Sequence, residues 1–119
     1  MQKYKPIATH IYIDCFFRDR AGLLNNGVKL LKILCDACRA ADVTIEDVLL
    51  KFYHPVGITI QVNVSESHVS LYTYPEENFC MIDILICGEK DATRVSDYIL
   101  SKLKPEKYTL KKDIVGKES

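Results

Sequence analysis

The sequence has no tryptophan, only five scattered glycines and no excess of charge, since 16 Lys and Arg residues balance 16 Asp and Glu residues. A neutral chain without a Lys/Arg block offers no general attraction for nucleic acid or for an anionic membrane surface. No apolar run approaches the roughly 20 residues that span a membrane, and the chain does not open on the apolar segment of a signal peptide. Scattered glycines also exclude a glycine-rich phosphate loop. These absences predict a cytoplasmic protein that binds neither nucleic acid nor a membrane.

Cysteines and histidines give no clear sign of a metal site. Five cysteines are an odd set, which disfavours a disulfide framework in a chain without an export signal. Cys35 and Cys38 form a C-x-x-C pair, but no second Cys or His pair stands at the spacing of a zinc site. Both fall within a helical pattern, so we interpret them as buried core residues. His10, His54 and His68 occur in unrelated contexts, and we expect no bound metal.

Length and hydrophobic periodicity predict one domain, residues 1–119, with two helices and six strands. The first helix would turn a stripe of apolar residues to the core, and Asp91 would cap the second helix. That predicted stripe is Leu24, Val28, Leu31, Leu34, Cys35 and Cys38. The strands are predicted at residues 10–17, 43–53, 58–64, 69–74, 79–87 and 107–115, and the helices at residues 23–42 and 92–103.

The order of these elements is strand, helix, four strands, helix, strand. It predicts an α+β two-layer sandwich, in which both helices pack on one face of a largely antiparallel sheet. The strand at residues 58–64 alternates apolar residues with Thr59, Gln61 and Asn63, which gives it one polar face. The strand at residues 79–87 is nearly all apolar, as a central strand would be. We expect the other sheet face to be solvated or to meet another subunit.

One triplet, Glu66-Ser67-His68, combines a carboxylate, a hydroxyl and an imidazole. Neighbouring strand residues point to opposite faces of a sheet, so His68 is poorly placed to act as a base for Ser67 in a serine triad. The G-x-S-x-G elbow of serine hydrolases is also absent. What remains is a serine beside a backbone carbonyl group, on a strand with a polar face and with a cysteine nearby in the fold.

The run from Glu66 to Glu76, E-S-H-V-S-L-Y-T-Y-P-E, is followed by Asp83 and Cys87-Gly88. It resembles the signature of the prokaryotic S-adenosylmethionine decarboxylase proenzymes. In that family the run reads E-S-H, a short stretch, H-T-[WY]-P-E and an apolar strand that ends in C-G. The resemblance covers essentially the whole chain, because the first strand, the long helix, the Pro-x-Gly turn and the second helix occur in matching order.

The resemblance implies a self-processing enzyme. Ser67 Oγ would attack the carbonyl carbon of Glu66, and β-elimination would then cleave the chain between Glu66 and Ser67. Ser67 would become an N-terminal pyruvoyl group, a cofactor that forms a Schiff base with the substrate amine and acts as an electron sink during decarboxylation. The implied substrate is S-adenosylmethionine, whose decarboxylated form supplies the aminopropyl group for polyamine (spermidine) synthesis. The implied assembly is a homodimer of processed protomers.

The resemblance also implies roles for single residues. Cys87 matches the proton donor, Glu76 the carboxylate that binds the ribose hydroxyls, and Tyr53 the aromatic residue that stacks on adenine. Thr59 stands where the family has a serine that assists processing. Tyr72 departs from the pattern, because the family has at this position a histidine that removes the Cα proton during processing. Tyrosine, with a reference pKa near 10 against about 6.5 for histidine, is the poorer base at neutral pH.

The departure at Tyr72 leaves two alternatives open. In the first, the same cofactor chemistry acts on ornithine or arginine instead of S-adenosylmethionine. In the second, the chain is an unprocessed homologue without catalytic activity that regulates or partners an active subunit. Retention of Ser67 and Cys87 favours an enzyme over this second alternative.

Overall fold

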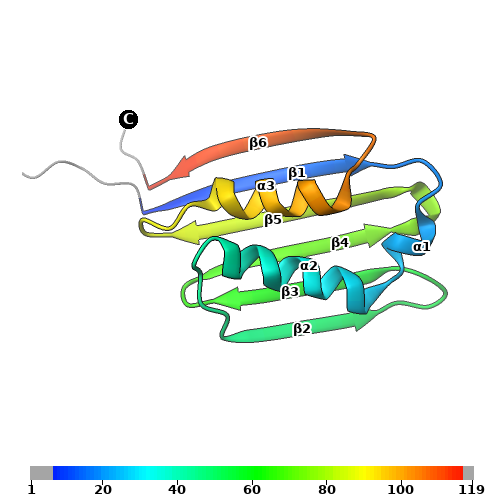
Figure 1. Cartoon of the computed structure of the whole chain (residues 1–119), viewed down its shortest axis with the longest axis horizontal. Coiled ribbons are helices and arrows are strands. Elements are labelled where there is room, and N and C mark those ends of the chain that lie inside the picture. Colours follow the sequence, from blue (N-terminus) through cyan, green and yellow to red (C-terminus); the bar gives the residue numbers. More distant parts are fainter. Residues whose placement is uncertain (1–6, 117–119) are drawn as a thin grey trace, which may run out of the picture.

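The computed structural model describes residues 7–116 and confirms the two-layer α+β architecture. Within these residues one antiparallel sheet of six strands runs in the order β2-β3-β4-β5-β1-β6, with α2 and α3 together on one face (Figure 1). The strands are β1 (Ala8–Phe16), β2 (Asp47–Phe52), β3 (Ile58–Val64), β4 (Ser67–Tyr74), β5 (Phe79–Cys87) and β6 (Lys107–Val115). The helices are α1 (Ala21–Leu24), α2 (Gly27–Ala40), α3 (Ala92–Leu103) and the 3₁₀ turn η1 (Pro75–Glu77).

The first predicted helix is in fact two helices. α1 is a single turn, and α2 begins only at Gly27, after Asn26. The Asn26 side chain accepts a hydrogen bond from the backbone N–H of Lys29 at 3.1 Å. Asparagine is among the preferred N-cap residues because its side-chain oxygen satisfies an otherwise unpaired N–H of the first turn. A helix start at this point therefore interrupts the segment that periodicity predicted as continuous.

The buried face of α2 is also rotated from the prediction. Val28, which we expected in the core, is 77% exposed, and Leu31 and Cys35 are only half-buried. Cys38 is fully buried, so the C-x-x-C pair is only partly a core feature. The buried residues of α2 are Gly27, Leu30, Ile33, Leu34, Ala37 and Cys38.

The second helix follows its prediction. The Asp91 side chain accepts a hydrogen bond from the backbone N–H of Thr93 at 2.9 Å, as an N-cap does. Val95, Ile99 and Leu103 are fully buried against the sheet. Together the two layers enclose one core, whose largest fully buried side chains are Ile11, Ile13, Leu24, Leu30, Leu34, Ile58, Ile60, Leu71, Ile82, Ile84, Ile86 and Ile99.

Two strand boundaries bear on the candidate site. β2 begins at Asp47 rather than at residue 43, and β4 begins at Ser67 rather than at residue 69. Ser67 pairs with Val64 of β3, so Ser65 and Glu66 alone form the turn between the two strands. The predicted cleavage point thus lies where a tight hairpin turn enters a strand.

The sheet face away from the helices carries many polar side chains beside the apolar Leu49, Met81 and Leu85. β5 lies between β4 and β1, as predicted for a central strand. Its burial alternates, because Asp83 and its neighbours two residues away lie on this uncovered face. No described element covers this face, which we call the polar face (Figure 1). Its polar residues are His10, Tyr12 and Asp14 of β1, Thr59, Gln61 and Asn63 of β3, His68, Ser70 and Tyr72 of β4, and Asp83 of β5.

Among residues 7–116, no helix is long and apolar enough to cross a membrane.

Candidate active site

Ser67 and Cys87 meet at the end of the sheet where β4 begins and β5 ends. Ser67 Oγ accepts a hydrogen bond from the backbone N–H of Cys87 at 2.8 Å. The Cys87 thiol, at 3.5 Å, donates to the carbonyl oxygen of Glu66, which belongs to the predicted scissile peptide bond. This hydrogen bond lies just beyond the last β4–β5 pair, His68 and Leu85. The nucleophile, the scissile carbonyl group and the thiol predicted from the sequence lie together.

Two small hollows flank this group. One, of about 210 Å³, is lined by Ser65, Glu66, Ser67, Cys87 and Gly88. The other, of about 150 Å³, lies between the sheet and the loops that precede β2 and α3, where Lys90 Nζ contacts Asp42 Oδ2 at 3.0 Å. Ser67 and Cys87 line both hollows, so neither side chain is sealed in the core.

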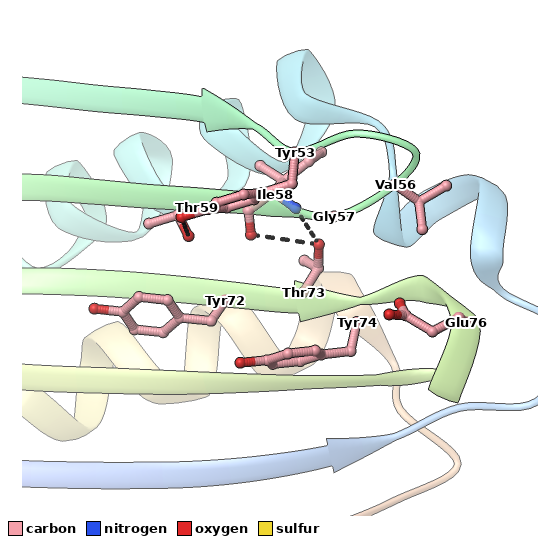
Figure 2. Close-up of a pocket in the computed structure, with 9 residues that line it drawn as sticks. All are labelled: Tyr53, Val56, Gly57, Ile58, Thr59, Tyr72, Thr73, Tyr74 and Glu76. Carbon is pink, nitrogen blue, oxygen red and sulfur yellow. Dashed lines mark hydrogen bonds between the residues drawn. The ribbon is translucent and has the colours of Figure 1, made fainter.

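The other four predicted site residues gather at the opposite end of the sheet. A cavity of about 410 Å³ there is lined by residues from the β2–β3 connection, β3, β4 and η1 (Figure 2). Glu76 is carried by η1, which Pro75 begins directly after β4. The lining residues are Tyr53, Val56, Gly57, Ile58, Thr59, Tyr72, Thr73, Tyr74 and Glu76. Val56 and Tyr74 were not predicted, since neither has a sequence signal beyond its place beside a turn.

Tyr53 is positioned by contacts to its side chain and to its loop. Thr59 Oγ1 donates to the Tyr53 hydroxyl at 3.2 Å, and the Lys51 ammonium lies 5.1 Å from the centre of the Tyr53 ring. The Asn25 side chain accepts a hydrogen bond from the backbone N–H of Gly57 at 3.1 Å, which ties the β2–β3 loop to the junction between α1 and α2. The aromatic ring therefore stands at a fixed edge of the cavity.

The two groups lie far apart within one chain. Ser67 and Tyr72 are five residues apart on β4, and a strand rises by about 3.4 Å per residue, so about 17 Å separates them along the sheet. The structure thus brings Ser67 together with Cys87, and Tyr72 together with Tyr53, Thr59 and Glu76. It does not bring the two groups into one pocket of a single protomer.

A third cluster, which the sequence did not reveal, links three strands of the polar face. His10 Nε2 of β1 and His68 Nε2 of β4 both contact the Asp83 carboxylate of β5, the latter at 3.0 Å. Burial works to raise the pKa of Asp83, but hydrogen bonds from His10 and His68 outweigh it and hold that pKa below its usual range. His68 points to Asp83 while Ser67 points to the Cys87 N–H, which confirms that they do not form a nucleophile–base pair. A lone carboxylate in an apolar strand was the only sequence signal for this cluster.

Comparison with known proteins gives the family. A sequence model of S-adenosylmethionine decarboxylase matches residues 9–114, nearly the whole chain. The chain belongs to the S-adenosylmethionine decarboxylase family. It is 36% identical over 115 residues to the S-adenosylmethionine decarboxylase proenzyme of Brevibacillus brevis, covering 96% of this chain and 86% of that protein. It is 32% identical over 103 residues to the proenzyme of the same name from Pyrobaculum neutrophilum, covering 85% of this chain and 82% of that protein.

A solved member of the family has the same fold. The crystal structure of the adenosylmethionine decarboxylase from Aquifex aeolicus superposes with a TM-score of 0.88, at 26% identity, and covers 98% of this chain and 96% of that one. The S-adenosylmethionine decarboxylase fold therefore extends over β1 to β6. Within residues 7–116 of the present chain, no three or more His, Cys, Asp or Glu side chains are grouped so as to hold a metal ion.

Proposed function

We propose that this chain is the proenzyme of a pyruvoyl-dependent S-adenosylmethionine decarboxylase that cleaves itself between Glu66 and Ser67 and serves polyamine synthesis. The observation that carries the proposal is the contact set at the β4–β5 end of the sheet. A serine hydroxyl is fixed next to the carbonyl group on its own N-terminal side, and the Cys87 thiol donates to that carbonyl oxygen. Membership of a family of proenzymes supports the same reading.

Self-cleavage would use these atoms in three steps. Ser67 Oγ adds to the Glu66 carbonyl carbon, the C–N bond breaks and the freed amine takes up the hydroxyl proton, which leaves an ester. The Cys87 thiol stabilises the negative charge that develops on the carbonyl oxygen. Removal of the Cα proton of Ser67 then expels Glu66 as a carboxylate, and hydrolysis of the remaining enamine releases ammonia and leaves the keto group.

Decarboxylation would divide the work between this cofactor and the chain. The pyruvoyl group, when formed, supplies a ketone that binds the substrate amine and withdraws electrons as CO₂ leaves. Cys87, next to residue 67, is placed to return a proton to the α-carbon. Glu76 supplies a carboxylate for the ribose hydroxyls and Tyr53 an aromatic ring for adenine. The cavity of about 410 Å³ between them is within the size range of small-molecule sites.

We also propose that the enzyme is a homodimer in which each active site is shared. Two polar faces packed against each other about a two-fold axis would set the Ser67 end of one sheet opposite the Tyr53–Glu76 end of the other. The separation of about 17 Å within one chain supports this arrangement.

The test is the intact mass of the purified protein under denaturing conditions. The parent is expected to give two chains, residues 1–66 and a pyruvoyl-blocked 67–119, and Ser67→Ala a single chain. Ser101→Ala, which changes an exposed serine of α3, is the matched control and should cleave like the parent. Cleavage that persists in Ser67→Ala would remove Ser67 from the mechanism. A parent that stays in one piece would favour the unprocessed regulatory homologue.

A second candidate keeps the cofactor and changes the substrate to ornithine or arginine. Tyr72 supports this candidate, because it replaces the family's histidine and lines the cavity expected to hold the substrate. Release of CO₂ from S-adenosylmethionine, ornithine and arginine, measured side by side on the cleaved protein, separates the two. Activity on S-adenosylmethionine alone supports the main proposal, and activity confined to a basic amino acid contradicts it.

A further inference from the structure

The turn before the predicted scissile bond has an unusual backbone conformation. Ser65, the first of its two residues, has φ = +53°. Glu66, the second residue, is not among the residues with positive φ. A positive φ at the first position only is the φ pattern of a type II′ turn, where glycine is strongly preferred because a Cβ atom is disfavoured there. Ser65 therefore holds a strained conformation directly before the Glu66–Ser67 unit.

We propose that this strain accelerates self-cleavage, so that Ser65 is a positioning residue for the processing step. The inference rests on the proposed function, because it concerns the rate at which Ser67 attacks Glu66. It does not require Ser65 to touch the reacting atoms. Its role would be to keep the precursor's turn in a conformation that cleavage releases.

Both sides of the turn are fixed, so the strain has no local way to relax. The β3–β4 ladder continues up to the pair of Val64 and Ser67, directly beside the turn. Ser67 Oγ is held by the Cys87 N–H, and the Cys87 thiol contacts the Glu66 carbonyl oxygen from the same neighbouring strand. On the polar face, His68 is bound to Asp83. The conformational cost is therefore confined to Ser65 and Glu66.

The chemistry relieves this confinement step by step. In the precursor, the Glu66 carbonyl carbon is linked to the Ser67 Cα through the peptide nitrogen alone. In the ester, the same two carbons are linked through Oγ and Cβ, a path one bond longer, so Ser65 gains room to return to negative φ. After elimination, no covalent link remains and Ser65 belongs to a free chain end. Strain present in the precursor and absent later favours each forward step.

Other left-handed residues in the chain offer a control. Lys104, with φ = +50°, ends α3, and its backbone N–H bonds to the Leu100 carbonyl oxygen at 2.9 Å. This is the usual place for a left-handed residue, where glycine is also preferred. A glycine at residue 104 relieves the same kind of strain on the helix side of the molecule, away from the turn.

The experiment compares cleavage half-times after cell-free synthesis of the full chain. Ser65→Gly is expected to slow cleavage about three- to tenfold, because glycine adopts the positive φ without strain. Ser65→Ala keeps the Cβ atom and removes only the hydroxyl, so it should cleave at the parental rate. Lys104→Gly should also leave the rate unchanged.

A second measurement separates strain from flexibility. In the uncleavable Ser67→Ala chain, adding Ser65→Gly should raise the free energy of unfolding by about 0.7–1.4 kcal/mol. This range is the expected three- to tenfold change in cleavage rate, converted at about 1.4 kcal/mol per tenfold. Greater flexibility alone would lower it or leave it unchanged. Adding Ser65→Ala should have no effect.

The outcomes distinguish the two levels of the argument. A parent that never cleaves, or that cleaves without Ser67, overturns the proposed function and this inference with it. A parent that cleaves through Ser67 while Ser65→Gly cleaves equally fast overturns the inference alone. So does slower cleavage of Ser65→Gly without a gain in precursor stability, because the slowing would then come from flexibility.

Discussion

Tyr72 departs from the family pattern that the sequence resembles, and its surroundings define the question it raises. It lies on the polar face between Thr59 of β3 and Met81 of β5. In the proposed dimer this end of the sheet faces the partner's Ser67, where a base must remove the Cα proton. A phenol with a reference pKa near 10 is a weak base at neutral pH. Processing is therefore expected to be slow.

Tyr72→His is predicted to raise the cleavage rate by at least about tenfold, since a positioned general base typically contributes 10²–10⁴-fold. The reason is that an imidazole has a pKa much closer to neutral pH. The measurement is the half-time for conversion of the intact chain into its two products. Tyr74→His, which places an imidazole two residues further along the same face, is the matched control and should not accelerate cleavage. A parent that already cleaves completely and rapidly would contradict the prediction.

At the scale of elements, the Asp83 bridge ties β4 and β1 to β5. It binds His68, which follows Ser67 on β4 and points to the polar face. After cleavage Ser67 would no longer be joined to β3 by the turn, so its position would depend on the pairing of β4 with β3 and β5 and on side-chain contacts such as this bridge. The bridge is thus placed to keep the start of β4 in register.

Asp83→Asn is predicted to lower the free energy of unfolding at pH 7 by about 1 kcal/mol, a figure reduced for the partial exposure of the cluster. The pKa of Asp83 is lowered in the folded state, so its contribution is present above the unfolded-state pKa of about 4 and is lost as pH falls through the lower folded-state value. The difference between parent and variant should therefore be full at pH 7 and shrink below about pH 4.

The measurement is urea unfolding of two proteins at equal concentration: the uncleavable Ser67→Ala chain, and the same chain with Asp83→Asn added. Asp36→Asn is the matched control, because Asp36 also bonds two basic side chains, Lys32 and Arg39, but on the solvent side of α2. It should change stability little. A loss for Asp83→Asn that is the same at pH 7 and pH 3 would show that the carboxylate charge is not its cause.

At the scale of the whole molecule, the question is whether one active site uses two chains. Ser67→Ala and Glu76→Gln, each expressed alone, are predicted to lack decarboxylase activity. Co-expressed in equal amounts, they should regain about a quarter of the parental activity, because half of the dimers are mixed and one of the two sites in each is intact. Sites built within a single chain would give no recovery. The mass of the native complex should show the dimer directly.

The cytoplasmic location predicted from the sequence stays a prediction.

Several features were predictable because their signals are local. The strand at residues 58–64 and α3 with its Asp91 cap depend on neighbours within four residues, and both were predicted correctly. The prediction of one continuous first helix was wrong for the same local reason, because Leu24 and Val28 are four residues apart and have the spacing of one helical face. The cap at Asn26 lies between them and restarts the helix, which leaves Val28 exposed.

The sequence by itself determined the order of the elements, the polar alternation of β3 and the chemical identity of Ser67, Cys87 and Glu76, since these follow from residue types and their spacing. Only the tertiary structure decided which of these residues meet. Cross-strand register joins His10, His68 and Asp83 across as many as 73 residues of chain, and strand length keeps Ser67 at one end of β4 and Tyr72 at the other. Register and length act between distant segments, and so no short stretch of sequence contains them.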